Sequence, residues 1–153
     1  MWNYIVLHHS LTKDNETVSW GAIRTYHTSN LGWSDIGYHW GVENINGHYE
    51  ILVGRTMSQT GAHTKEMNMN TQGIGICCVG NFDVEPPPDT QLISLSRIVT
   101  WLMKEYKIPQ EHIIGHRDAG LMAGFDWRKG EYKTCPGSMF NMEHFKSLLP
   151  PFS

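Results

Sequence analysis

His116 and Cys135 are the first residues in this sequence whose types could do chemistry together. His116 directly follows the apolar pair Ile113-Ile114, so we expect it at the carboxyl end of a buried strand. Cys135 stands across a long Gly-rich loop that we expect over residues 115–137. An imidazole and a thiolate are ligand types that zinc prefers. Two ligands do not complete a site, so a third must come from another segment.

The candidate for a third ligand lies near the other end of the chain. There the apolar run Tyr4–Leu7 ends in His8 and His9. Side chains alternate along a strand, so only one of these two histidines can point into a given site. Three protein ligands with one open position are typical of a catalytic rather than a structural zinc. The three segments are far apart in sequence, so spacing alone does not specify this ligand set.

The cysteines do not form a disulfide framework. Cys77 and Cys78 are adjacent and would point to opposite faces of a strand, which suits two packed free thiols better than a metal chelate. Cys135 lies in a polar loop before Pro136, where packing does not account for a thiol. Chemistry is therefore the better interpretation for Cys135.

Hydrophobic patterning predicts the elements that position these residues. Strands are expected at residues 4–7, 38–45, 49–53, 74–79 and 113–114, and helices at 20–27, 90–106 and 142–149. Asn46-Gly47 favours a tight hairpin turn, and the expected helix N-caps are Ser19, Asp89 and Asn141. Polar residues 10–19 and 54–70 are interpreted as loops, and the second is long enough to carry binding. The order implies an α/β fold: one domain over residues 1–153, with a mixed central β-sheet flanked by helices.

Composition limits the partners. The chain has 153 residues and a net charge of −3, and no cluster of Lys and Arg stands out, so nucleic-acid binding is not expected. No segment approaches the roughly 20 apolar residues needed to cross a bilayer, so no membrane partner is expected. The first residues lack the basic region of a signal peptide. We expect synthesis in the cytoplasm without a signal, and a monomer.

Nine histidines is a high count, and most have ordinary interpretations. Exposed or capping roles are expected for His27, His48, His112 and His144. The other five lie at strand ends or in loops that leave strands, where open α/β sheets build their sites. These are His8, His9, His39, His63 and His116.

Six short blocks occur in order along the chain. They are YIVLHHS (4–10), GYHW (37–40), GAH (61–63), GIGICCVGNF (73–82), GHRD (115–118) and KTCPG (133–137). Together they resemble the zinc-dependent type 2 N-acetylmuramoyl-L-alanine amidases, the family that includes bacteriophage T7 lysozyme and the peptidoglycan recognition proteins. The resemblance extends over nearly the whole chain. Each block alone is weak, but six in order are specific.

The resemblance implies that His8, His116 and Cys135 are the zinc ligands. Tyr38 matches the catalytic tyrosine of the family, and Lys133 matches a lysine that phage members carry two residues before the cysteine. Recognition proteins without activity lack this cysteine, and intracellular members that recycle wall fragments have aspartate there. The chain therefore resembles the active, non-recycling members.

The resemblance also implies the substrate, which is the amide between N-acetylmuramic acid and L-alanine in bacterial peptidoglycan. The GAHT segment lines the cleft in the family, which makes His63 a candidate substrate-binding residue, and His39 beside Tyr38 is a second. Trp33, Trp40 and Trp127 could offer flat faces to sugar or peptide, although Trp40 suits the core equally well. For Asp118 two roles stay open: holding His116 in one tautomer, or pairing with Arg117.

Two other functions compete with the amidase. In a cysteine hydrolase, Cys135 would be the nucleophile and a histidine its base. In a non-catalytic module, the same fold would bind peptidoglycan or a partner protein. As an amidase without a signal, the chain fits a bacteriolytic, antimicrobial phage-type endolysin that reaches the wall through a holin-like pore, and an exported toxin or prophage remnant fits nearly as well. Some phage members bind host RNA polymerase, and only that analogy indicates such a partner here.

Overall fold

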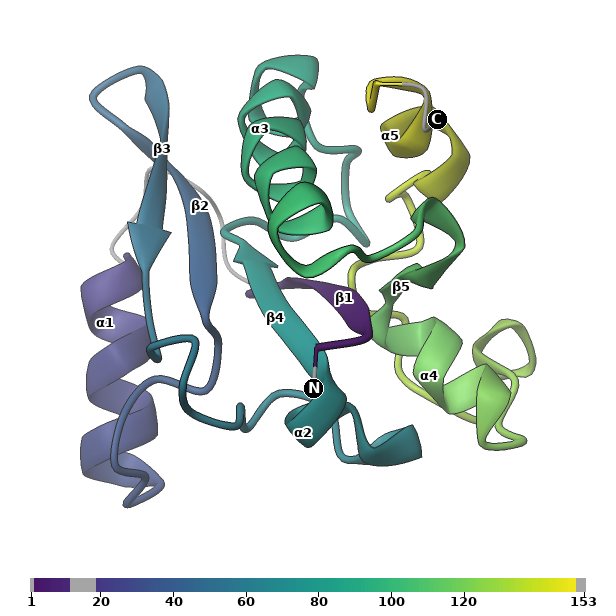
Figure 1. The fold of residues 1–153 in the computed structure, drawn as a ribbon. Helices are drawn as coiled ribbons and strands as arrows, with labels where there is room; N and C mark the ends of the chain where they lie inside the picture. Colours follow the sequence, from purple (N-terminus) through teal and green to yellow (C-terminus); the bar gives the residue numbers. More distant parts are fainter. Residues whose placement is uncertain (1, 12–18, 151–153) are drawn as a thin grey trace.

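The computed structural model describes residues 2–11 and 19–150, and its centre is a five-stranded mixed sheet (Figure 1). The strands are β1 (Tyr4–His9), β2 (Trp40–Ile45), β3 (His48–Val53), β4 (Gly73–Cys78) and β5 (Ile113–Gly115), in the spatial order β3-β2-β4-β1-β5. β1 pairs in parallel with both β4 and β5, β2 pairs in parallel with β4, and only β2–β3 is antiparallel. The predicted α/β fold with a mixed sheet flanked by helices is confirmed.

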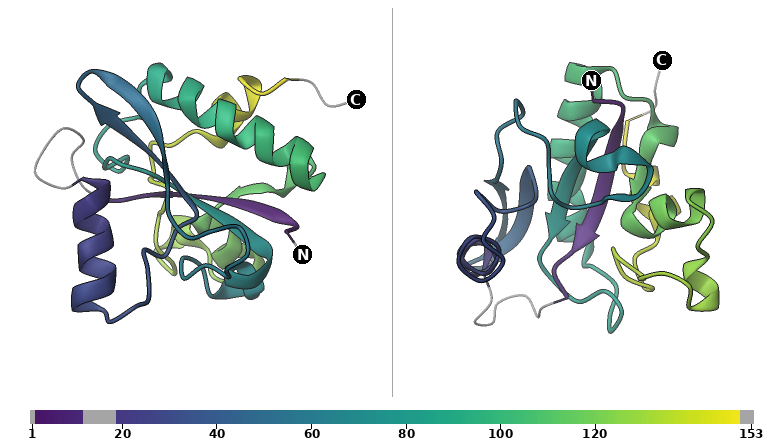
Figure 2. Two further views of the ribbon diagram at one scale, coloured as in Figure 1. Left: turned by 60° about the vertical axis from the view of Figure 1, so that its left-hand side comes forward. Right: turned by 90° about the horizontal axis from the view of Figure 1, so that it is seen from below.

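The helices are α1 (Trp20–Thr25), α2 (Met69–Gln72), α3 (Asp89–Tyr106), α4 (His116–Met122) and α5 (Met142–Ser147). In both figures α3 and α5 lie on one side of the sheet, and α1 and α4 lie on the other (Figures 1 and 2). No helix in the described ranges is long and apolar enough to cross a membrane.

The two central strands are apolar because both of their faces are covered. Every residue of β4 is buried, and in β1 all but Tyr4 are buried, as expected for parallel strands between helical layers. Cys78 packs in the larger core under α3, whereas Cys77 packs in the smaller core beside α1. Both are free thiols on opposite faces, as the sequence predicted.

Local signals placed most elements correctly. Asn46 and Gly47 have φ values of 54° and 87°, which are the positive values that a type I′ turn requires. The side chains of Ser19 and Asn141 accept hydrogen bonds from the first turns of α1 and α5, as N-caps do.

Three expectations were wrong in detail. Asp89 is the first helical residue of α3, not its cap, because Pro88 takes the extended cap position with φ fixed by its ring. The first helix ends at Thr25 and continues as a π-helical turn, Tyr26–Asn30. The expected loop after Gly115 begins instead with α4. Residues 12–18 of the expected loop 10–19 lie outside the described part of the chain.

The loop 54–70 is mostly irregular, as predicted, and it ends in a 3₁₀ turn, Glu66–Asn68, that leads into α2. The side chain of Asn70 accepts hydrogen bonds from the backbone N–H groups of His63 and Thr64 at 2.6 and 2.7 Å. This anchor brings the middle of the loop against the ends of β1 and β4.

Candidate metal centre and cleft

The sheet brings His8, His116 and Cys135 to one point. β1 and β5 are parallel neighbours with Leu7 opposite Gly115, so the residues that follow, His8 and His116, lie side by side. Their ring centroids are 4.8 Å apart, and His8 Nδ1 lies 3.6 Å from the sulfur of Cys135. One ligand atom from each of the three residues lies within 4.8 Å of the other two.

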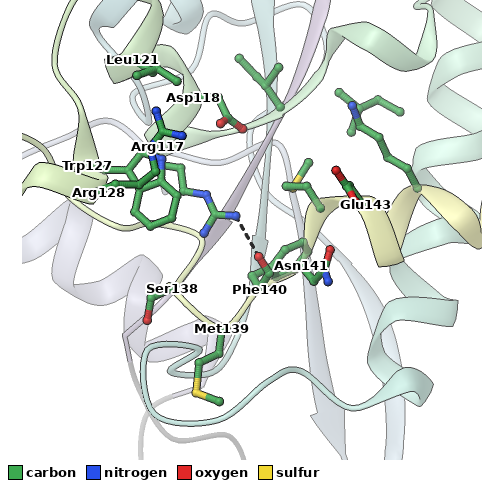
Figure 3. Close-up of a pocket in the computed structure, with 14 residues that line it drawn as sticks. Arg117, Asp118, Leu121, Trp127, Arg128, Ser138, Met139, Phe140, Asn141 and Glu143 are labelled. Atoms are coloured by element: carbon green, nitrogen blue, oxygen red, sulfur yellow. Dashed lines mark hydrogen bonds between the residues drawn. The ribbon is translucent and has the colours of Figure 1, made fainter.

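The turn that carries Cys135 is held from two sides. The backbone N–H of Arg117 donates to the carbonyl of Cys135 at 2.7 Å, and its guanidinium donates to the carbonyls of Gly137 and Phe140 at 2.6 and 2.8 Å (Figure 3). On the other side, Asp83 accepts hydrogen bonds from Thr134 and Ser138. Gly137 has φ 121°, and a Cβ there would meet the backbone of Phe82 at 2.5 Å, so only glycine fits.

A histidine relay determines which nitrogen of His8 carries the proton. His63 Nε2 lies 2.9 Å from the carbonyl oxygen of Gly73, which only accepts, so this nitrogen is protonated. His63 Nδ1 then accepts from His8 Nε2 at 3.0 Å. His8 keeps a free lone pair on Nδ1, the nitrogen that faces the sulfur of Cys135.

The protonation states suit a metal ligand set. Burial lowers the pKa of His8 well below its usual value and, with the positive charge of Lys133, lowers the pKa of His116 to about 4, so both rings are neutral at pH 7. Burial raises the pKa of the Cys135 thiol to about 12, although the backbone N–H of His9 and the charge of Lys133 partly oppose it. A metal cation would remove this proton outright. Two neutral imidazoles and one buried sulfur fit a three-ligand zinc site.

The ligand cluster opens into a cavity of about 530 Å³ that Tyr38 and Lys133 also line. The Tyr38 ring lies 5.1 Å from that of His8, between centroids, and burial and the neighbouring Cys77 raise the pKa of its hydroxyl well above the usual value. Tyr38 is therefore a neutral hydrogen-bond donor at pH 7. Lys133 stands two residues before Cys135 on the same turn.

A second cavity of about 590 Å³ continues from the first. The two share Trp33, His63 and Lys133 among their lining residues, and Phe125 and Glu66 belong to the second alone. They form one cleft with the ligand cluster in its first lobe and an aromatic and charged second lobe.

The two predicted substrate-binding histidines use both ring nitrogens within the protein. His39 is buried, accepts from the backbone N–H of Gly75 at 3.1 Å and donates to the carbonyl of Gln59 at 2.9 Å. It lines neither lobe of the cleft. His63 borders both lobes, but its nitrogens are bonded to His8 and Gly73. These contacts favour structural and positioning roles rather than substrate hydrogen bonds.

Both roles considered for Asp118 were wrong. Its carboxylate accepts from the backbone N–H of Gly115 at 2.7 Å and so caps its own helix. The third residue of a helix commonly reaches back in this way.

The sequence missed three residues that support the site. His27, expected on an exposed face, accepts from the N–H of Gly37 at 3.0 Å and packs its ring near that of Tyr38. Tyr132 lies 3.0 Å from His116 Nε2 through its hydroxyl, and Glu66 contacts the same hydroxyl. His27 stands at helical spacing from Trp20, which could have suggested an inward face, whereas no motif marks Tyr132 or Glu66.

The predicted tryptophans have different fates. Trp33 lines both lobes, so it can offer a face to a ligand. Trp127 lies outside the cleft in a rear groove of about 740 Å³, where it stacks on the Arg117 guanidinium at 4.4 Å (Figure 3). Trp40 is half-buried against the main core. Of the three, only Trp33 is placed to meet a ligand in the cleft.

Comparison with known proteins defines the class. Residues 1–138 match the family model described as N-acetylmuramoyl-L-alanine amidase. The chain is 30% identical over 124 residues to peptidoglycan-recognition protein SC2 of Drosophila melanogaster, covering 77% of this chain and 65% of that protein. It is 34% identical over 124 residues to the N-acetylmuramoyl-L-alanine amidase of Sus scrofa, covering 79% of this chain and 18% of that protein. The chain thus spans less than two thirds of the length of these relatives.

Solved structures agree. The amidase LysC from Clostridium intestinale superposes with a TM-score of 0.71 at 28% identity, over 95% of this chain and 83% of that one. Drosophila PGRP-LB in complex with tracheal cytotoxin superposes with a TM-score of 0.70 at 24% identity, over 93% and 79%, and shows the same fold. Fold and site thus define a protein of the class that cleaves or binds peptidoglycan. The chain belongs to the N-acetylmuramoyl-L-alanine amidase family.

Proposed function

We propose that this chain is a zinc-dependent amidase that hydrolyses the bond between N-acetylmuramic acid and L-alanine in peptidoglycan. The observation that carries the proposal is the convergence of His8, His116 and Cys135 at the floor of a cleft that Tyr38 and Lys133 also line. These three residues would hold the ion through two imidazole nitrogens and a sulfur. When bound, zinc supplies a Lewis acid and lowers the pKa of water from 15.7 to about 7.

The protein's own residues would do the rest of the chemistry. The fixed positive charge of Lys133 would stabilise the negative charge that develops on the carbonyl oxygen of the scissile amide. The neutral hydroxyl of Tyr38 would orient the attacking water, or donate a proton towards the leaving amine of L-alanine. Both side chains line the lobe that contains the ligand cluster.

The cysteine-hydrolase alternative is disfavoured by the state of the thiol. Burial raises the pKa of Cys135 to about 12, so little thiolate exists at pH 7 without a metal. The thiol, unlike the thiolate, is a poor nucleophile. This alternative also leaves one of the two converging histidines without a role.

The non-catalytic alternative has a specific observation in its favour, because several similar relatives are named peptidoglycan-recognition proteins. Against it, the complete ligand cluster occurs together with Tyr38 and Lys133 in one cavity. Ligands without turnover would have no need of these two additional groups.

The biological role that we propose is that of a phage-type endolysin, made in the cytoplasm and acting on the wall after release. A structure similar at 28% identity is described as the endolysin amidase LysCS from Clostridium intestinale. Expression inside a susceptible bacterium should lyse the cells only when a pore-forming protein is co-expressed. Lysis without a pore would contradict the requirement for separate release.

The reaction is tested by the products formed from purified peptidoglycan. An amidase releases stem peptides with a free N-terminal L-alanine and glycan with intact N-acetylmuramic acid, which mass spectrometry distinguishes. A chelator should stop release and zinc should restore it. Binding to peptidoglycan without products would support the non-catalytic module. Products that persist after chelation but disappear on thiol alkylation would support the cysteine hydrolase.

A further inference from the structure

We propose that Tyr132 and Glu66 are positioning residues for His116, through a relay that runs from His116 Nε2 to the Tyr132 hydroxyl and on to the Glu66 carboxylate. The inference rests on the proposed function, because it assigns these residues to holding a zinc ligand in its binding tautomer. The observation behind it is that one hydroxyl contacts both groups: Tyr132 Oη lies 3.0 Å from His116 Nε2 and is hydrogen bonded to Glu66 Oε1.

The direction of each hydrogen bond follows from the chemistry of the groups. An ionised carboxylate only accepts, so the Tyr132 hydroxyl donates its single proton to Glu66. The hydroxyl oxygen can then only accept from His116, which places the imidazole proton on Nε2. His116 Nδ1 is left with the free lone pair. A ligand histidine that gives its other N–H to a carboxylate-linked partner is fixed in orientation and is a stronger ligand.

The position of the Tyr132 hydroxyl is fixed by packing. Its ring stacks on that of Phe125, with centroids 6.3 Å apart and planes 19° apart, and meets the edge of the His116 ring at 5.6 Å. On α4, a Cβ at Gly120 would lie 2.3 Å from the ring, so the glycine admits the tyrosine against the helix. The ring therefore has one seat, and that seat points the hydroxyl at His116.

Glu66 is equally well placed. It belongs to the 3₁₀ turn at the end of the loop 54–70, where Met67 and Asn68 both have positive φ values of 54° and 58°. Its side chain is only 12% exposed, and one carboxylate oxygen lies 4.0 Å from His116 Nε2. The relay thus joins the long loop, the start of α4 and the segment before Cys135.

The other ligand histidine has a relay of the same polarity. His8 donates from Nε2 to His63, which donates to the carbonyl of Gly73. Both histidines are thereby left with the same free nitrogen, Nδ1, beside Cys135. The two relays use unrelated residues, so the shared outcome follows from what the site requires and not from one packing accident.

The test compares Tyr132→Phe, Glu66→Gln and the matched control Tyr106→Phe in the intact chain. Tyr132→Phe keeps the ring and removes only the hydroxyl, whereas Tyr106 lies at the end of α3, away from the site. Zinc dissociation constants are measured by competition with a chromophoric chelator. We expect Tyr132→Phe to bind zinc roughly 10–100-fold more weakly. Glu66→Gln, which still accepts from Tyr132, should lose less, and Tyr106→Phe should match the parent.

A second readout does not depend on zinc. Long-range ¹H–¹⁵N NMR spectra of the zinc-free protein report which imidazole nitrogen is protonated. We expect His116 to be the Nε2–H tautomer in the parent and a mixture in Tyr132→Phe. Unchanged tautomer and unchanged zinc affinity in both site variants would overturn the relay. A parent that binds no zinc would overturn the proposed function instead, and the tautomer spectra would still decide the relay.

Discussion

At the scale of single residues, the site depends on where protons sit as much as on which residues are present. His63 illustrates this, because it lies in a block typical of a substrate cleft but uses both nitrogens to fix His8. The ligand types themselves were predictable from sequence, since packing rarely requires histidines at strand ends or a cysteine in a polar loop. Their hydrogen-bond partners were not predictable, because such bonds join residues more than fifty positions apart.

The role of His63 is tested by two substitutions that differ in one property. Asn places an oxygen near the position of Nδ1 and can accept from His8, whereas Leu cannot. His63→Leu should weaken zinc binding roughly 10–100-fold, and His63→Asn should weaken it less. Zinc competition titrations give both constants. Equal affinities for the two variants would show that acceptance by His63 does not matter.

Lys133 is expected to act on charge and not on metal binding. Lys133→Ala should lower kcat roughly 100-fold, because a fixed positive charge near the developing oxyanion is lost. Zinc content should stay at the parental level. The control Lys129→Ala removes an exposed lysine from the preceding 3₁₀ turn and should leave kcat unchanged. Loss of zinc in Lys133→Ala would indicate a structural role.

At the scale of elements, success followed locality. α3 and the β2–β3 hairpin were predicted well because an amphipathic repeat and an Asn-Gly turn are local signals. α4 was missed because it is only seven residues long, starts at a candidate ligand and contains Gly120, which lowers its helix propensity. Its position is set by tertiary contacts, chiefly those of Arg117 with the turn that carries Cys135.

Arg117 is therefore predicted to stabilise the fold and the ligand turn together. Arg117→Met removes two charge-assisted hydrogen bonds to Gly137 and Phe140, each worth about 1.5–3 kcal/mol. Urea denaturation should show a loss of about 2–4 kcal/mol. The control Arg97→Met changes an exposed residue of α3 and should alter the free energy of unfolding by under about 0.5 kcal/mol. A loss equal to that of the control would contradict this role.

At the scale of the whole molecule, the site exists because distant segments meet at one edge of the sheet. Parallel pairing of β1 with β5 places His8 beside His116, but no sequence spacing reveals that pairing. Only the six ordered blocks of the family predicted which residues converge. The same convergence buries several neutral histidines, and this gives the folded state a characteristic response to acid.

Acid should destabilise the zinc-free protein. Burial lowers the pKa of His9 and of His116 to about 4, and that of His63 to about 3, from an ordinary 6.5. Between pH 6.5 and 4 the unfolded chain binds more protons than the folded chain, so stability is complete above pH 6.5 and falls as the pH drops. For a chain of this size each 1 kcal/mol lowers Tm by roughly 2–4 °C. Thermal scans should give a Tm at pH 5 at least about 5 °C below that at pH 7, and an unchanged Tm would contradict the neutral cluster.

The most direct test of the central claim is titration of the zinc-stripped protein with zinc, following bound metal and release of N-terminal L-alanine from peptidoglycan in the same samples. The account predicts that activity rises in proportion to bound zinc and saturates at one ion per chain. Cys135→Ser should bind zinc far more weakly, and the control Cys78→Ser, which changes a thiol in the opposite core, should keep the stoichiometry. Full activity in the stripped protein, or one zinc per chain without any release of L-alanine, would contradict the proposed amidase.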